Sequence, residues 1–302
     1  MSFILLLIGF LLLIKGADYF VDSASAIARK FHIPSMIIGL TIVSIGTSLP
    51  ELSVSLTSAL IGKNDLAVAN VVGSNIFNIL MGLGVTSIIS KLPIEKNTIE
   101  NDIPFLNIIG SILLMMMLNL TLNRFEGILL IGLLIGFLFY IIKPVLNNKE
   151  ESKEESKLSF KTILLGILGV VGIILGGDMV VDSASNIAKM FGMSQNLIGL
   201  TVVALGTSLP EFVTSVIAGI KGENEIAIGN IIGSNIFNIL MILGISSIIS
   251  PIVISFISVI DIMFMIAIGI LLYVFVVKSK TLKRYQSIVF IFLYIGYISY
   301  TI

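Results

Sequence analysis

Two glutamates stand in the middle of long apolar stretches of this sequence, each within the same six residues. Glu51 ends GTSLPE at residues 46–51, and Glu211 ends a second GTSLPE at residues 206–211. An ionised carboxyl inside a bilayer is costly unless it is paired. The surrounding apolar stretches offer no Lys or Arg at that depth. A carboxylate without a protein partner predicts a bound cation.

A proline precedes each glutamate and adds further oxygen acceptors. Pro50 has no backbone N–H and its ring clashes with the preceding turn, so it should free carbonyls near Gly46 and Thr47. Freed carbonyls are tolerated at membrane depth only where they are buried in protein or face a polar cavity. One such copy is compatible with a hinge whose glutamic acid is protonated and hydrogen-bonded. Two copies with the same neighbours favour a cation site.

A second polar motif follows each GTSLPE. It reads NVVGSNIFNIL at residues 70–80 and NIIGSNIFNIL at residues 230–240. Its polar residues recur at i, i+4 and i+8 and therefore share one helix face: Asn70, Ser74 and Asn78, then Asn230, Ser234 and Asn238. Ser and Asn also pack ordinary membrane helices together, which leaves that interpretation open for Asn70 and Ser74. Asn78 and Asn238 are the better ligands, because their amide carbonyls would complete an oxygen cage.

The residue types present restrict the kind of cation. The chain has no cysteine, and its one histidine, His32, lies near the end of a predicted helix. A site made only of oxygens suits Ca²⁺, Mg²⁺ and Na⁺ rather than Zn²⁺ or Cu²⁺. Ca²⁺ accepts about six to eight oxygens in loose geometry, whereas Mg²⁺ prefers to keep its waters. The sequence also carries no basic stripe that would bind nucleic acid.

The elements that must position these residues are membrane helices. The 302 residues are 56% hydrophobic and 12% charged, with a mean hydropathy of +1.10, whereas soluble chains are about a quarter charged. Apolar stretches of about 18–25 residues recur throughout. We predict an all-α polytopic membrane protein with ten spans, at about 2–28, 35–61, 66–89, 102–120, 125–143, 159–188, 195–220, 226–249, 254–277 and 285–301.

The two halves of the chain are a repeat. At an offset of 160 residues, residues 39–90 align without gaps with residues 199–250, and about 30 of 52 positions are identical. The repeats should cover residues 1–146 and 158–302, joined by a charged linker at 147–157. Each half holds an odd number of spans, so the second enters the membrane from the opposite side, as in many secondary transporters. We expect helices two, three, seven and eight to be broken at the motifs.

The basic residues predict an orientation. One set of alternate connectors carries fourteen Lys and Arg residues, whereas the other carries only Lys63, Arg124 and Lys189. The basic side should be cytoplasmic. This places both termini outside the cell membrane and the 147–157 linker inside.

GTSLPE followed by GSNIFNIL, twice in ten spans, resembles the sodium/calcium exchangers of the Ca²⁺/cation antiporter superfamily. The resemblance covers essentially the whole chain, without the large regulatory domain of animal members. It implies antiport of Na⁺ and Ca²⁺ by alternating access, with no cofactor and no obligatory protein partner. It also implies the site: central Glu51 and Glu211, the carbonyls of Thr47 and Thr207, Asn78 and Asn238, and sodium positions at Ser48, Ser208, Ser74, Ser234 and the carbonyls of Ser44 and Ala204.

By the same resemblance, spans one and six form a long tilted pair that slides across the core. Four aspartates lie on this pair: Asp18, Asp22, Asp178 and Asp182. We interpret them as interfacial or packing residues, with a lining of the ion passage as the alternative.

One departure from the family pattern bears on coupling. Many relatives, notably the potassium-dependent branch, carry Asp where this chain has Asn238. Asn78 and Asn238 leave the site with two formal negative charges, which one Ca²⁺ would neutralise. If three Na⁺ replaced it, the site would carry a net positive charge. We therefore expect electrogenic exchange that does not depend on K⁺.

Other functions fit less well. An H⁺/Ca²⁺ antiporter of the same superfamily is the main alternative, because a buried pair of glutamates can also bind protons. Proton-coupled relatives usually carry a GNA-type motif in place of GTSLPE. An intramembrane protease is not expected, since LGGD at 175–178 falls short of GxGD and HExxH is missing. A channel is disfavoured because inverted repeats with broken helices are typical of alternating access.

Overall fold

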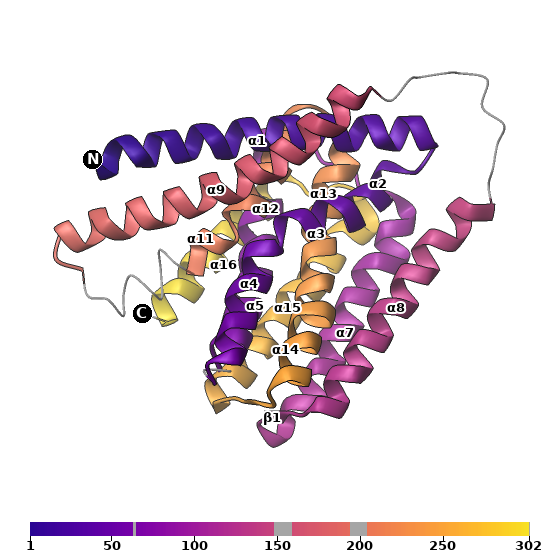
Figure 1. The fold of residues 1–302 in the computed structure, drawn as a ribbon. Helices are drawn as coiled ribbons and strands as arrows, with labels where there is room; N and C mark the ends of the chain where they lie inside the picture. Colours follow the sequence, from indigo (N-terminus) through magenta and orange to yellow (C-terminus); the bar gives the residue numbers. More distant parts are fainter. Residues whose placement is uncertain (63–64, 148–158, 194–203, 302) are drawn as a thin grey trace.

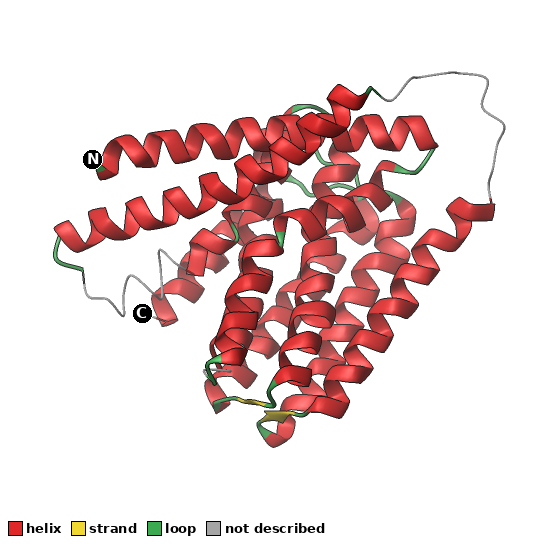
Figure 2. Ribbon diagram, in the orientation of Figure 1, coloured by secondary structure: helices red, strands yellow, loops and turns green. Residues whose placement is uncertain are grey.

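The computed structural model describes residues 1–62, 65–147, 159–193 and 204–301, and nearly all of them are helical (Figure 2). The first half contains α1 (Ser2–Phe31), α2 (Ser35–Ile38), η1 (Gly39–Val43), α3 (Ser44–Thr47), α4 (Leu49–Leu60), α5 (Asp65–Phe77), η2 (Asn78–Leu83), α6 (Gly84–Ile89), η3 (Thr98–Asp102), α7 (Ile103–Met116), η4 (Met117–Asn119), β1 (Thr121–Leu122) and α8 (Arg124–Asn147). The second contains α9 (Phe160–Met190), α11 (Ala204–Thr207), α12 (Leu209–Ile220), α13 (Asn224–Phe237), η6 (Asn238–Ile242), α14 (Leu243–Ile249), β2 (Ile252–Val253), α15 (Phe256–Ser279) and α16 (Arg284–Thr301).

The helices agree with a polytopic membrane protein. Within the described ranges, seven helices are long and apolar enough to cross a membrane, and one bent helix pair makes an eighth. α12 and α16 occupy parts of predicted spans seven and ten but are not among these eight. The start of predicted span seven and nearly all of the predicted linker lie outside the described residues. The ten-span count stays a prediction.

The two longest helices, α1 and α9, run side by side and antiparallel across one end of the bundle (Figure 1). Glycines bring their backbones together. A Cβ built on Gly16 would lie 2.7 Å from the Gly169 carbonyl oxygen, and one on Gly176 would lie 2.7 Å from the Gly9 carbonyl oxygen. Small residues permit such close approach of membrane helices. We call this contact the glycine seam.

The first GTSLPE interrupts a helix, as predicted. α3 ends at Thr47, α4 begins at Leu49, and the two segments are bent by 49°. Ser48 between them has φ −84° and ψ 8°, in the sparsely populated region between helix and strand conformations. Pro50 lies in the first turn of the new helix, where N–H groups have no intrahelical partner. The proline therefore starts the second segment rather than kinking a continuous helix.

The second GTSLPE repeats this geometry. α11 ends at Thr207, α12 begins at Leu209, and Ser208 has φ −89° and ψ 0°. Pro210 again lies in the first turn of the new helix. The same six residues thus produce the same break in both halves of the chain.

The predicted breaks in helices three and eight are wrong. α5, η2 and α6 form one continuous helix over Asp65–Ile89, and α13, η6 and α14 form another over Asn224–Ile249. Each widens into a π-helical stretch that begins at Asn78 or Asn238. Neither motif contains a proline, so no backbone donor is lost and the helix bulges instead of ending. Such π-bulges are frequent at functional sites.

The connectors pair at both ends of the bundle. At one end β1 and β2 are antiparallel, with Thr121 opposite Val253. At the other end Pro93 pairs with Thr281, and the Ile94 N–H donates to the Lys280 carbonyl at 2.8 Å. Both pairings join connectors that the sequence assigns to the same side of the membrane.

Candidate cation site

The two glutamates are both fully buried, each in the first turn of a helix that follows a break. Ser48 Oγ donates to Glu211 Oε1 at 2.8 Å. Ser74 Oγ donates to Glu51 Oε1 at 3.4 Å. The Ser48 bond joins the break of one repeat to the carboxylate of the other, so the two GTSLPE motifs form one cluster.

Besides the Ser208 hydroxyl, four oxygens of this cluster are buried without a hydrogen-bond partner among the described residues. They are Glu51 Oε2, Glu211 Oε2, Asn78 Oδ1 and Asn238 Oδ1. Buried polar atoms are normally hydrogen-bonded, so unpartnered ones call for an explanation. All four are acceptors and two belong to carboxyl groups, which is the donor set that a hard cation prefers. The residues fit Na⁺ or Ca²⁺ as cargo.

Asn70 and Asn230 brace the broken helices. The side-chain amide of Asn70 donates to the backbone carbonyl of Glu51 at 3.3 Å and to Ser55 Oγ at 3.1 Å. Asn230 makes the matching bonds to the Glu211 carbonyl and Ser215 Oγ, at 3.1 and 2.9 Å. These amide donors are used in holding the helices together, so the packing interpretation suits both asparagines.

The two threonines link the repeats through their hydroxyls. Thr47 Oγ1 donates to Asn230 Oδ1 at 3.0 Å, and Thr207 Oγ1 donates to Asn70 Oδ1 at 3.2 Å. With the hydroxyls engaged in these bonds, the backbone carbonyls stay the predicted cation ligands of both residues. Both threonines are the last residues of their helical segments, directly before the break.

Ser44, Ser208 and Ser234 are the remaining predicted ligands whose side chains are described, and all three are buried. Ser208 and Ser234 are fully buried, and Ser234 Oγ lies 3.5 Å from Thr47 Oγ1. Ser44 Oγ donates to the Leu40 carbonyl at 2.8 Å within its own helix. Ala204 begins α11, and its side chain is not among those described.

Sequence reasoning missed Asn75 and Asn235. Both are fully buried, and each contacts the candidate ligand asparagine of the other repeat. The signal was available, because both lie in GSNIFNIL and are separated by the repeat offset of 160 residues.

Buried carboxylates and other oxygen acceptors between two halves of an apolar helical bundle are typical of membrane proteins that transport ions. The family model described as "Sodium/calcium exchanger protein" matches residues 1–143 and 161–302. The chain belongs to this family.

Individual relatives agree in extent. The putative antiporter CaxA of Alkalimonas amylolytica is 41% identical, with 82% of this chain and 81% of the relative covered. The sodium/calcium exchanger MaX1 of Methanosarcina acetivorans is 32% identical, with 98% and 97% covered. A solved structure of the sodium-calcium exchanger NCX_Mj superposes with a TM-score of 0.88 at 30% identity, covering 100% of this chain and 99% of that one.

Proposed function

We propose that this protein exchanges Na⁺ for Ca²⁺ across the cell membrane by alternating access. The observation that carries the proposal is the set of four unpartnered, buried acceptor oxygens on Glu51, Glu211, Asn78 and Asn238. Two repeats contribute to this set equally, so a cation held there lies between halves that can move relative to each other. Family membership supports the same cargo.

The residues are proposed to act as follows. Glu51 and Glu211 are the central ligands for both cations, with the carbonyls of Thr47 and Thr207 beside them. Asn78 and Asn238 complete the middle of the site. Sodium alone would use the peripheral positions: Ser48, Ser208, Ser74, Ser234 and the carbonyls of Ser44 and Ala204.

The proposed architecture is ten spans in two inverted repeats, residues 1–146 and 158–302. The 147–157 linker is cytoplasmic and both termini are outside. The connector pairings at Thr121–Val253 and Pro93–Thr281 support this alternation of sides. The bias of fourteen basic residues to one side supports the orientation.

Coupling is proposed to be electrogenic and independent of K⁺. The proposal rests on the charge of the site, which holds two carboxyl groups and two neutral amides. One Ca²⁺ balances two carboxylates, whereas three Na⁺ leave one positive charge to cross the membrane. Inside-negative and inside-positive potentials should therefore change the initial rate in opposite directions.

Transport by purified protein tests the function. Proteoliposomes loaded with Na⁺ and diluted into Na⁺-free medium should take up labelled Ca²⁺, with equal rates in the presence and absence of K⁺. Glu51→Gln and Glu211→Gln should each abolish uptake. Asp102→Asn is the matched control, because Asp102 is another buried carboxyl but lies at the junction of η3 and α7. Ca²⁺ uptake driven by a pH gradient alone would contradict Na⁺ coupling and would show that protons drive the exchange.

A further inference from the structure

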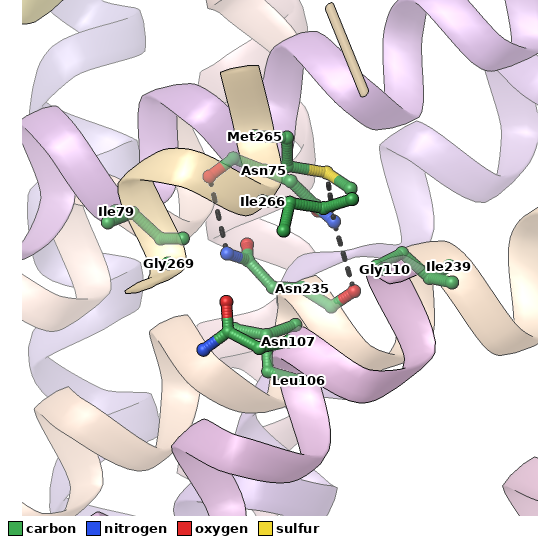
Figure 3. A pocket seen from close by; sticks show the side chains of 10 residues that line it. All are labelled: Asn75, Ile79, Leu106, Asn107, Gly110, Asn235, Ile239, Met265, Ile266 and Gly269. Carbon is green, nitrogen blue, oxygen red and sulfur yellow. Dashed lines mark hydrogen bonds between the residues drawn. The ribbon is translucent and has the colours of Figure 1, made fainter. Parts of the chain in front are cut away.

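Asn75 and Asn235 face each other between the two repeats, beside a small cavity (Figure 3). Asn75 Nδ2 donates to the backbone carbonyl of Asn235 at 3.1 Å, and Asn235 Nδ2 donates to the backbone carbonyl of Asn75 at 3.2 Å. The pair is therefore reciprocal and joins α5 to α13.

These bonds fix the polarity of two more amides. A backbone carbonyl only accepts, so each of the paired asparagines must turn its Nδ2 toward it and its Oδ1 away. Asn238 Nδ2 donates to Asn75 Oδ1 at 3.0 Å, and Asn78 Nδ2 donates to Asn235 Oδ1 at 3.1 Å. Asn78 and Asn238 are thereby left with their Oδ1 atoms free, which are two of the four unpartnered acceptors.

We infer that Asn75 and Asn235 are positioning residues that keep the amide oxygens, and not the amide N–H groups, of Asn78 and Asn238 toward the cation. Without Asn235, the Asn78 amide could rotate by half a turn and present donors to a positive ion. Without Asn75, the Asn238 amide would keep only its donation to Ser74 Oγ at 3.2 Å. This inference rests on the proposed function. It adds the residues that decide whether amide oxygens or amide N–H groups point toward the cation.

The test separates positioning from structural support. Asn75→Leu removes both the donor and the acceptor while keeping a similar branched shape, and should raise the KM for Ca²⁺ about 10- to 100-fold, as loss of a second-layer partner does at metal sites. Asn235→Leu should do the same, since it occupies the matching position, and serves if Asn75→Leu does not fold. Asn107→Ala is the control, because Asn107 lines the same cavity but donates to the Ile103 carbonyl of its own helix.

Binding gives a second readout that needs no transport. Ca²⁺ should raise the Tm of the wild-type protein and of Asn107→Ala in detergent at micromolar to millimolar concentrations, and should do so for Asn75→Leu only at concentrations higher by the same factor. Folded Asn75→Leu and Asn235→Leu with wild-type KM and Ca²⁺ response would overturn the inference. If the wild-type protein transports no Ca²⁺ at all, the proposed function fails instead.

A different observation concerns α1 and the turn after α12. Lys221 Nζ lies 2.6 Å from Asp18 Oδ1 and 2.6 Å from Asp22 Oδ1, and donates to the Asp18 carbonyl at 2.9 Å. Arg29 Nη1 lies 3.2 Å from Glu223 Oε1, and Ser25 Oγ donates to the same oxygen. We call these five charged residues, Asp18, Asp22, Arg29, Lys221 and Glu223, the clamp.

Lys221, Asp18 and Glu223 of the clamp are partly shielded from solvent, whereas Asp22 and Arg29 are exposed. The Lys221 side chain is 24% exposed. Partial burial acts to lower the pKa of Lys221, but the hydrogen bonds and charges of Asp18 and Asp22 outweigh it, so the pKa is raised. The ammonium group therefore stays charged between its two carboxylates.

Among the described residues, the matching half of α9 has no such partner. At the offset of 160 residues, Asp18 and Asp22 correspond to Asp178 and Asp182, which are exposed. Lys221 corresponds to Ile61 and Glu223 to Lys63, while Arg29 corresponds to Lys189. The turn after α4 corresponds to the turn after α12. If α9 lay against it as α1 lies against the turn after α12, Asp178 and Asp182 would meet Ile61, and Lys189 would meet Lys63.

Packing is unequal in the same sense. Val21, Ala24 and Ser25 of α1 are buried, whereas the corresponding Val181, Ala184 and Ser185 of α9 are only partly buried. Ser185 Oγ has no hydrogen-bond partner in the described part of the chain.

We propose that the clamp makes the two access states unequal and holds the protein in the state in which α1 covers α12. In inverted-repeat transporters the opposite state exchanges the roles of the repeats. That state would lose the clamp and gain no equivalent. This proposal rests on alternating access, but its test uses purified protein and no transport.

The chain has no cysteine. A spin-label pair at Leu60→Cys and Met190→Cys therefore reports the distance between the end of α9 and the end of α4, where the matching turn begins. Exchanging the turn charges, as Lys221→Ile with Glu223→Lys and Ile61→Lys with Lys63→Glu, should increase the short-distance population about tenfold or more. Lys96→Ile is the control, because its ion pair with Glu100 is exposed and lies within one segment. An unchanged distance distribution in the fourfold variant would overturn the clamp. Exchange activity with an unchanged distribution would leave the proposed function intact.

Discussion

At the scale of single residues, Ser48 connects the two halves of the candidate site. Its hydroxyl donates to Glu211 Oε1, and its backbone forms the break that precedes Glu51. A hydrogen bond to a charged group contributes about 1.5–3 kcal/mol. The residue therefore contributes to both carboxylates, by a hydrogen bond at Glu211 and by the direction of the chain at Glu51.

Ser48→Ala should weaken cation binding while leaving the fold in place. The lost bond corresponds to roughly a 10- to 100-fold increase in the Na⁺ concentration needed for half-maximal Ca²⁺ release. Ser53→Ala on the exposed face of the same helix should change this concentration less than twofold. Equal effects of the two substitutions would show that the Ser48 hydroxyl does not serve the site.

The candidate ligands could be predicted from sequence because their types conflict with an apolar helix. Glu51, Glu211, Asn78 and Asn238 are polar at positions where lipid or packing demands apolar side chains. Asn75 belongs to the same motif, but its role depends on a contact with the other repeat. Helical spacing places a residue on a face and does not say which atom of another helix meets it.

At the scale of elements, the breaks carry the site. In both copies the chain leaves helical geometry at the serine two residues before the proline. A helix ends with free carbonyls and the next begins with free N–H groups. Thr47 therefore lies at the end of the first helical segment and Glu51 in the first turn of the second, on opposite sides of the break in the helix.

Pro50→Ala should test the need for that break. Alanine restores an N–H that can bond to the Gly46 carbonyl, so the helix can become continuous and the 49° bend can relax. We expect unchanged or higher Tm and a roughly tenfold lower initial rate of Ca²⁺ uptake, equivalent to about 1.4 kcal/mol. Pro104→Ala in the first turn of α7 is the control and should leave uptake unchanged.

Element prediction succeeded at the prolines and failed at helices three and eight. Proline removes a donor wherever it stands, so its effect is local and readable. The π-helical stretches at Asn78 and Asn238 have no such local cause in GSNIFNIL. Their geometry depends on how each helix packs across the repeat interface, which sequence spacing does not contain.

At the scale of the whole molecule, the repeat organises both ends of the bundle. The connectors that carry Lys96 and Val253 lie at the ends defined by the Pro93–Thr281 and β1–β2 pairings. The duplication was readable from the offset of 160 residues. The unequal packing of α1 and α9 was not, because it depends on contacts between the repeats that an alignment of the two halves does not contain.

Thiol labelling tests the orientation. Lys96 and Val253 are exposed, and the chain has no other cysteine to react. A membrane-impermeant maleimide should label Val253→Cys in intact cells and Lys96→Cys only after the membrane is opened. The reverse pattern would invert the proposed topology without affecting the fold.

The glycine seam has a mechanical consequence for a carrier of this design. Backbones in direct contact at Gly16–Gly169 and Gly9–Gly176 leave no room for side chains to slip. Under the proposed alternating access, α1 and α9 would move across the bundle as one rigid unit. Opening of the site toward one face would then be tied to its closing toward the other. A leak through both faces at once would require the seam itself to part.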